Sequence, residues 1–290
     1  MRNLRQILQV AYPILIFERM LINKVWGNKK GKLRVLICHD IPPNEEKRFA
    51  SLLNWLSQRW NFVSPERFGQ MIQGKAPIEG KNLLLTFDDG FASNIRVAEE
   101  VLKPMRVRAL FFVISDFINI ENKNEARLFI AQNIHPGLSV NQLPKHLYNM
   151  KWKDLEILLK NGHTIGAHTK THARLSDRQV YMSMREEIIG SADHLENHLG
   201  VEIEHFAFTF GDLASITPEA INVACSRFKY IHTGLRGDNA KDVPTWAVRR
   251  DVINLGDSKW LVGTLLEGIA DRFYTKSLIK YESWKDHGQM

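Results

Sequence analysis

Short apolar runs alternate with amphipathic segments along most of this chain. The runs end abruptly in polar residues or glycine, which is typical of buried strands. The segments between them repeat apolar residues every three or four positions, which predicts helices with one buried face. The predicted strands are residues 33–38, 61–63, 83–87, 108–113, 163–167, 205–210, 230–233 and 246–248. The predicted helices are residues 45–58, 64–72, 93–102, 152–160, 176–199, a helix that begins at Thr217, and residues 255–273.

Regular alternation of strand and helix predicts a mainly parallel sheet, either closed as a barrel or open. The 290 residues are 44% hydrophobic, which is sufficient for one large core. Residues 119–150 interrupt the pattern and contain Pro136-Gly137 and Pro144. An irregular segment of this length in a compact enzyme is often a functional lid.

The two ends of the chain differ from the central part. We expect residues 1–32 to be a basic, amphipathic segment with a linker, residues 33–275 the main domain, and residues 276–290 a basic tail. The N-terminal apolar stretch is too short to span a bilayer and has no signal-peptide cleavage pattern. It could rest on an anionic membrane surface or pack on the main domain. We expect a cytoplasmic protein in peripheral contact with the inner membrane, with its oligomeric state left open.

Net charge is +7 and the sequence pI is about 9.3, which fits an anionic partner or simply a basic soluble protein. Nucleic acid is not expected as that partner, because the chain has no helix-turn-helix pattern, Cys/His finger or aromatic RNA-binding motif. The two cysteines, Cys38 and Cys225, lie beside apolar residues and are expected to be buried thiols.

Two short motifs contain the candidate catalytic and metal-binding residues. Asp88-Asp89-Gly90 follows the apolar run of residues 83–87, and His168 and His172 follow the run of residues 163–167. Adjacent carboxylates repel each other unless a cation or a proton separates them. One carboxylate and two imidazoles form a three-ligand site with an open position, as in catalytic zinc centres. The second carboxylate is then free to act as a base.

Each motif alone has a simpler interpretation. Asp-Asp-Gly is a common surface turn, and two histidines four residues apart are more often helix-surface residues than metal ligands. Their occurrence together, each after a buried strand, favours a metal site.

At this point the chain resembles the polysaccharide deacetylases, the NodB-homology domain of carbohydrate esterase family 4, over residues 33–251. Residues 86–90 (Thr-Phe-Asp-Asp-Gly) and residues 168–172 (His-Thr-Lys-Thr-His) are similar to the family's first two motifs. The resemblance implies a distorted (β/α)7 barrel in a single domain, and metal-dependent removal of N-acetyl groups from amino sugars. It assigns Asp88 as the base, and Asp89, His168 and His172 as ligands of Zn²⁺ or another divalent transition metal.

The third motif departs from the family pattern. In residues 206–211, Ala207 stands where many members have arginine and Thr209 where most have proline. This version is similar to the branch that includes the poly-N-acetylglucosamine deacetylases, whose last motif has moved to the front of the domain. Residues 36–40 (Leu-Ile-Cys-His-Asp) resemble that motif and imply His39 as the general acid. Either Arg249 or Arg250 would replace the missing arginine, and we prefer Arg250.

The expected partner is an N-acetylated glycan or a lipid-linked sugar precursor. Because the third motif is altered, a non-catalytic glycan-binding protein on the same fold stays open as an alternative. A deformylase or amidase that acts on another small amide is the second alternative.

Overall fold

The computed structural model describes the backbone of residues 31–286 and, within that range, all side chains other than those of residues 179, 181, 285 and 286. The segment expected at a membrane surface lies almost entirely outside the described residues, so its membrane contact stays a prediction. No helix in residues 31–286 combines the length and the apolar character that a membrane crossing requires.

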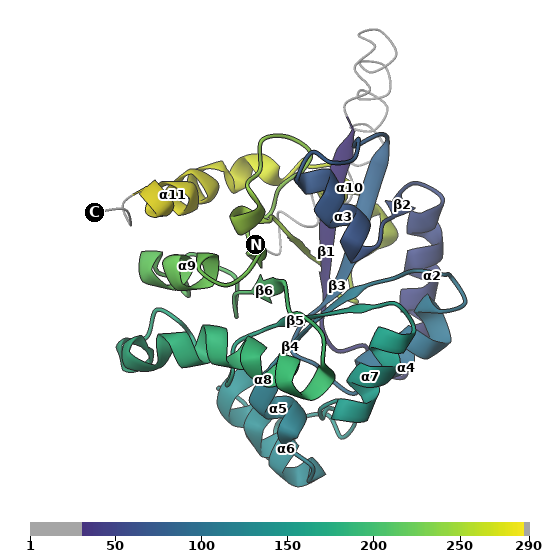
Figure 1. Cartoon of the computed structure of the whole chain (residues 1–290). Coiled ribbons are helices and arrows are strands. Elements are labelled where there is room, and N and C mark those ends of the chain that lie inside the picture. Colours follow the sequence, from purple (N-terminus) through teal and green to yellow (C-terminus); the bar gives the residue numbers. More distant parts are fainter. Residues whose placement is uncertain (1–30, 287–290) are drawn as a thin grey trace, which may run out of the picture.

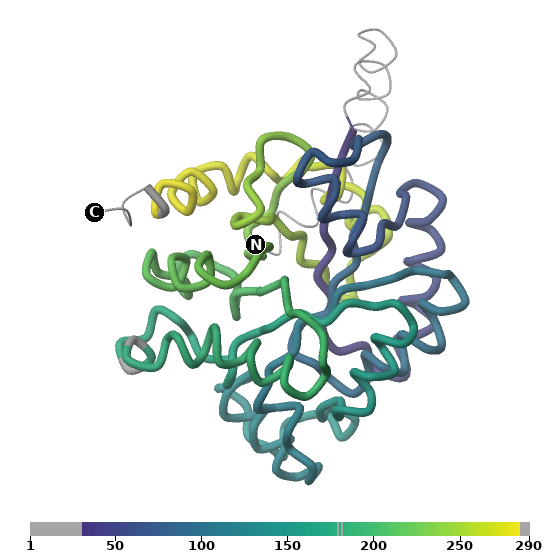
Figure 2. Tube along the Cα trace, in the orientation of Figure 1, coloured from purple at the N-terminus to yellow at the C-terminus, as the bar shows by residue number. Residues whose placement is uncertain are grey.

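The strands of the described chain form one parallel sheet of eight strands that curls into a half-barrel (Figures 1 and 2). Their order is β7-β6-β5-β4-β3-β1-β8, with β2 paired to β3. The arrangement confirms the prediction of a single-domain barrel of the NodB type. The strands are β1 (Lys32–Cys38), β2 (Asn61–Phe62), β3 (Lys81–Phe87), β4 (Leu110–Val113), β5 (Thr164–Ala167), β6 (His205–Ala207), β7 (Tyr230–His232) and β8 (Asp251–Val252).

Helices surround this sheet in Figure 1. Side-chain caps begin several of them: Ser64 accepts the N–H of Arg67, Thr217 that of Ala220, and Ser258 that of Leu261. The α-helices are α2 (Glu46–Ser57), α3 (Pro65–Ile72), α4 (Ser93–Val97), α5 (Ser115–Asn119), α6 (Lys123–Phe129), α7 (Trp152–Lys160), α8 (Ser191–Leu199), α9 (Pro218–Cys225), α10 (Lys259–Leu266) and α11 (Thr275–Asp286). Short 3₁₀ or π segments are η1 (Ala98–Leu102), η2 (Ile130–Ile134), η3 (Val140–Gln142), η4 (Arg178–Ser183), η5 (Glu186–Gly190), η6 (Thr245–Ala247) and η7 (Asp271–Phe273).

Several predicted boundaries are wrong. The single helix expected at residues 176–199 is divided into η4, η5 and α8, and the helix expected at residues 255–273 is α10 followed by η7. Gly268, with φ of +84°, lies between α10 and η7 and ends the helical path. Residues 276–286, which are part of the tail expected at residues 276–290, belong to α11, whose Leu278 and Tyr281 are buried.

Residues 120–150 are far more ordered than the irregular pattern indicates. This segment, called the insert below, contains α6, η2 and η3 and connects β4 and α5 to α7. Its apolar side chains form a separate core cluster with Phe91, Ile114 and Phe117. The Arg127 guanidinium donates hydrogen bonds to the backbone carbonyls of Val140, Leu143, Pro144 and Leu147. The insert is therefore an ordered part of the fold, stabilised by its own apolar cluster and hydrogen bonds.

Candidate metal centre

The two motifs meet at the carboxyl edge of the sheet. Asp88 and Asp89 follow β3, and His168 follows β5, two strands away in the sheet order. Parallel strands bring their carboxyl ends to one edge, where ligands of α/β folds bind. Asp88, Asp89, His168 and His172 are all buried.

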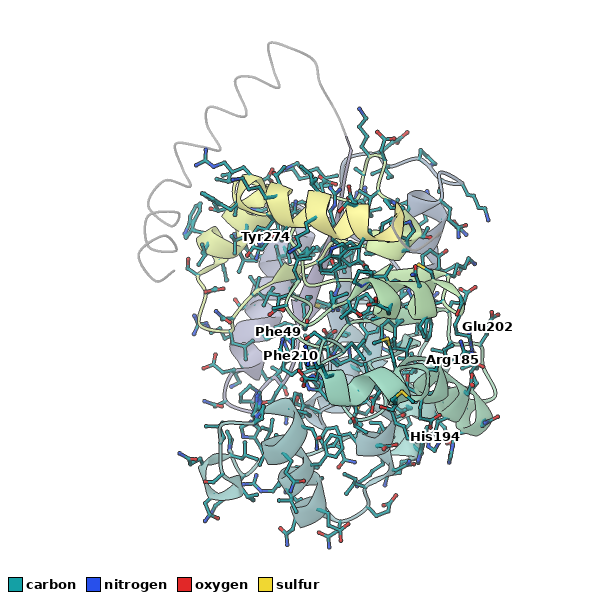
Figure 3. The ribbon with its side chains drawn as sticks, turned by 90° about the vertical axis from the view of Figure 1, so that its left-hand side faces the viewer. Phe49, Arg185, His194, Glu202, Phe210 and Tyr274 are labelled. Carbon is teal, nitrogen blue, oxygen red and sulfur yellow. The ribbon has the colours of Figure 1, made fainter. Side chains whose placement is uncertain are left out.

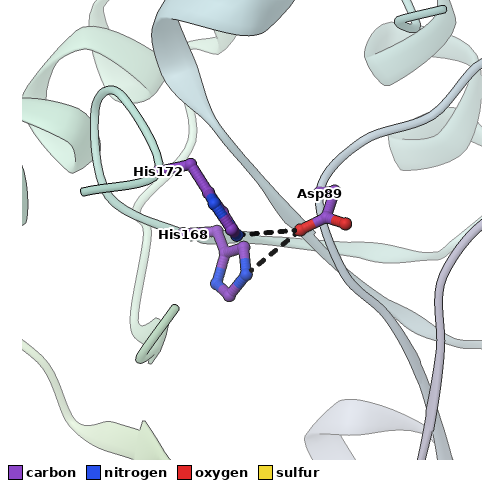
Figure 4. A group of neighbouring side chains, drawn as sticks. All are labelled: Asp89, His168 and His172. Atoms are coloured by element: carbon purple, nitrogen blue, oxygen red, sulfur yellow. Dashed lines mark ion pairs between the residues drawn. The ribbon is translucent and has the colours of Figure 1, made fainter. Parts of the chain in front are cut away.

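Asp89 contacts both imidazoles (Figure 4). Its Oδ1 lies 3.4 Å from Nε2 of His168 and 3.4 Å from Nε2 of His172. One ligand atom from each of the three residues falls within 4.8 Å of the others. Carboxylate oxygen and imidazole nitrogen suit zinc and neighbouring divalent metals. The donor set and its convergence therefore fit a metal ion with three protein ligands.

The other nitrogen of each imidazole is held by the backbone. Nδ1 of His168 lies 2.8 Å from the Ala207 carbonyl oxygen, and Nδ1 of His172 lies 2.9 Å from that of Asn133. A carbonyl only accepts, so each Nδ1 must carry the proton and donate it. When the rings are neutral, this assignment leaves Nε2 of both as a lone-pair donor, the outer-shell arrangement found at histidine metal ligands.

Glu187 holds the loop between the two histidines. Its Oε2 accepts the backbone N–H groups of Lys170 (3.1 Å) and Thr171 (3.0 Å), and its Oε1 accepts the Thr171 hydroxyl (2.8 Å). The loop also contains Thr169 and His172 in left-handed backbone conformations, at φ of 59° and 65°. Non-glycine residues rarely adopt this region, and where they do, the surrounding contacts must stabilise it. The carboxylate of Glu187 supplies such contacts.

The negative charge of Asp89 and positive charge on the neighbouring imidazoles stabilise each other. Burial alone would raise the pKa of Asp89, but hydrogen bonds from His168 and His172 hold that pKa well below its usual value. Burial alone would lower the pKa of His172, but the adjacent Asp89 outweighs burial and raises it. Without a metal ion, the cluster is therefore stabilised by a proton on imidazole.

Asp88 has a different partner from Asp89. Its Oδ1 lies 2.8 Å from Nη1 of Arg250, whose Nε donates to the Thr233 carbonyl at 2.8 Å. Asp88 and Arg250 are both buried. Arg249, the other arginine considered, pairs with Glu282 of α11 at 2.9 Å. At this edge of the sheet, the Arg250 side chain therefore points inward to Asp88 and the Arg249 side chain points outward, as expected for adjacent residues.

His39 lies directly after β1, beside the two carboxylates. The Asp88 N–H donates to the Cys38 carbonyl at 2.9 Å, and the His39 carbonyl accepts Nδ2 of Asn94 at 2.9 Å. The His39 side chain is exposed, yet its charge contributes to lowering the pKa of Asp89. Burial and then Asp88 raise the pKa of the neighbouring Cys38 thiol.

The altered third motif forms another side of the site. Its Thr209 hydroxyl donates to the Ala173 carbonyl at 2.6 Å, so the residue in place of proline connects β6 to the histidine loop. The strand expected at residues 205–210 ends at Ala207, and Phe210 beyond it has a φ of 61° and is 40% exposed. Its ring lies 4.7 Å from that of His172 and 4.1 Å from the Arg174 guanidinium carbon. In Figure 3 it is at mid-height of the molecule, below α11.

Sequence reasoning missed two histidines of the insert. His146 Nε2 lies 2.9 Å from Oδ2 of Asp40. His135 follows η2, and its pKa is lowered by burial, with smaller effects from Asp89, His172 and His39. Both residues lie in the segment expected to be a functional lid. That expectation could have indicated them as candidate site residues. The insert therefore contributes to the site from two points.

Comparison with known proteins agrees with this geometry. The family model described as polysaccharide deacetylase matches residues 75–225. The Bacillus subtilis (strain 168) protein YxkH, whose name assigns it provisionally to the polysaccharide deacetylases, is 26% identical over 155 residues. That match covers 51% of this chain and 46% of YxkH, so it spans less than half of that relative.

Two solved structures share the fold. IcaB from Ammonifex degensii has a TM-score of 0.65 and 23% identity, over 82% of this chain and 98% of IcaB. The Streptococcus pyogenes deacetylase PplD, solved in complex with acetate, has a TM-score of 0.63 and 19% identity, over 81% of this chain and 98% of PplD. These similarities show that the fold is shared over most of the chain.

The division between Asp88 and Asp89 predicts different metal contents for two matched variants. Asp89→Asn removes the charged ligand and should lose most bound zinc, whereas Asp88→Asn should keep about one equivalent per chain. His168→Ala should resemble Asp89→Asn. Elemental analysis of protein purified without chelator measures all three, and equal metal loss in both aspartate variants would contradict the division.

Metal affinity should rise with pH across the range above the ordinary imidazole pKa. The raised pKa of His172 means that a proton must leave before Nε2 can bind a metal ion. Below that raised pKa the proton competes and binding weakens; above it the competition ends. Zinc titrations of chelator-treated protein at several pH values test this, and a pH-independent dissociation constant would exclude the proton competition.

Proposed function

Because the chain belongs to the polysaccharide deacetylase family, we propose that it is a metal-dependent hydrolase that removes N-acetyl groups from amino sugars of a glycan. The observation that carries the proposal is the pairing of Asp89 with two imidazoles while Asp88 is held separately by Arg250. This arrangement provides metal ligands and a base side by side. An N-acetylated glycan or a lipid-linked sugar is the proposed substrate.

Asp89, His168 and His172 would hold the metal, with zinc as the proposed ion. When bound, such an ion lowers the pKa of water toward ~7 and polarises a carbonyl oxygen. Asp88 then has the role of general base. Arg250 holds Oδ1 of Asp88, which fixes the direction of the carboxylate and places Oδ2 outside that contact.

The remaining groups act on the oxygen and nitrogen of the amide. The backbone N–H of Phe210 is the proposed donor to the developing oxyanion, and its strained loop is held by the Thr209 hydroxyl. His39 donates a proton to the departing nitrogen, because an amine anion is a very poor leaving group. The products are acetate and a free amino sugar.

Acetate release from a panel of N-acetylated glycan oligomers and lipid-linked sugars tests the proposal. We expect acetate and one new amine per cleavage with the wild-type chain. Asp88→Asn, which should keep the metal, should be slower by on the order of a hundredfold or more. Glycan binding without acetate would favour the non-catalytic alternative, and hydrolysis restricted to formamides or other small amides would favour the second alternative.

Replacing His39 should slow the hydrolysis of amides more than that of activated esters, because their leaving groups differ in their need for a proton. His39→Ala should hydrolyse N-acetyl amides poorly, while an aryl acetate, whose phenolate leaves without protonation, should be affected much less. The ratio of the two kcat values, compared with wild type, is the measurement. An equal loss on both substrates would show that His39 does not act as the proton donor.

A further inference from the structure

The two carboxylate oxygens of Asp40 have different surroundings. Oδ2 lies 2.9 Å from Nε2 of His146, which reaches it from the insert. Oδ1 is buried and has no hydrogen-bond partner among the described residues. A buried carboxylate oxygen without a donor is costly, so one in a functional region indicates a donor that approaches it during function.

The imidazole of His39 is suited to be that donor. His39 precedes Asp40 directly, and its exposed ring is not held by packing. The backbone around it is held, because Asn94 donates to the His39 carbonyl and Ser93 accepts the Ile41 N–H at 3.0 Å. The ring is therefore free to change its orientation while the main chain stays in place.

His146 has the fixed position that an anchor requires. The insert that contains it is stabilised by the four carbonyl contacts of Arg127, two of them to Pro144 and Leu147, which flank His146. The same insert provides the Asn133 carbonyl that orients His172. It thus contacts the site both at the metal ligands and at the residue next to the proposed acid.

Resting on the proposed hydrolysis, we propose that His146 is a positioning residue for proton donation by His39. His146 donates from Nε2 to Oδ2 of Asp40 and fixes the carboxylate, so that Oδ1 accepts an N–H of the His39 ring. That hydrogen bond determines which ring nitrogen faces the substrate. In the reaction, the proton on that nitrogen passes to the departing amine nitrogen as its bond to the acetyl carbon breaks, and His39 becomes neutral.

A double-mutant cycle in the full-length chain, loaded with zinc, tests this role. His146→Ala should lower kcat for an N-acetylated glycan oligomer by on the order of tenfold or more, since a loosely positioned catalytic group is that costly. It should change kcat for an aryl acetate much less and leave zinc content unchanged. The exposed neighbour Lys145 provides the matched control, and Lys145→Ala should equal wild type on both substrates.

The cycle with Asp40→Asn shows whether the two residues act together. If His146 acts through Asp40, the double variant should be no slower than Asp40→Asn alone, whereas independent effects would multiply. His146→Gln keeps a donor and should restore part of the amide rate. This variant also replaces His146→Ala in the cycle if the alanine variant does not fold.

Failure of this inference is distinct from failure of the proposed function. A wild-type chain that releases no acetate from any N-acetylated substrate would overturn the proposed function itself. With an active wild type, His146→Ala at the wild-type amide rate, an equal loss on amide and ester, or multiplicative losses in the cycle would each overturn only the role of His146.

Discussion

Asp88 and Asp89 are adjacent and buried, and each requires its own positive partner. Two carboxylates at this spacing in a low-dielectric environment cannot both be ionised without compensation. The fold meets this constraint by directing them apart. Asp88 contacts Arg250 from the segment before β8, and Asp89 contacts His168 and His172 after β5. The left-handed conformation of Asp89, at φ of 75°, lies at the point where the two directions separate.

The rest of the site depends on this separation. Strands β1, β3, β4, β5 and β6 are consecutive neighbours, so their carboxyl ends bring His39, the two aspartates, the histidine loop and the altered third motif to one edge, where Arg250 reaches Asp88 from the segment before β8. Around that edge the backbone supplies acceptors to Nδ1 of both histidines, and Glu187 holds the loop between them. These backbone and Glu187 contacts thus hold the charged side chains in position without taking part in the proposed reaction.

The alternation of apolar runs and helical repeats could predict a mainly parallel sheet, and the resemblance of the motifs to those of the polysaccharide deacetylases implied the barrel. The sequence could also predict Asp88, Asp89, His168 and His172 as one site, because each motif follows a buried strand. Their separate roles stay predictions that metal analysis and kinetics must test. The choice between Arg249 and Arg250 needed the fold, since the direction of a side chain after η6 depends on how β8 pairs with β1.

The ordered structure of the insert could not be predicted from the sequence. Its order comes from Arg127, whose hydrogen bonds to four carbonyls leave no periodic signal, and from a small core shared with Phe91 and Phe117. The approach of His146 to Asp40 joins residues 106 positions apart, which no local pattern can reveal. Contacts of this kind arise from tertiary packing and become visible only in the folded chain.

The most direct test of the account is crystal diffraction recorded at the zinc absorption edge from protein loaded with one equivalent of zinc. The account predicts one anomalous peak bound by the Asp89 carboxylate and by Nε2 of His168 and His172 at about 2.0–2.2 Å, with Asp88 still paired to Arg250. A peak at other residues, or one in which Asp88 leaves Arg250 and binds zinc in place of Asp89, would contradict it.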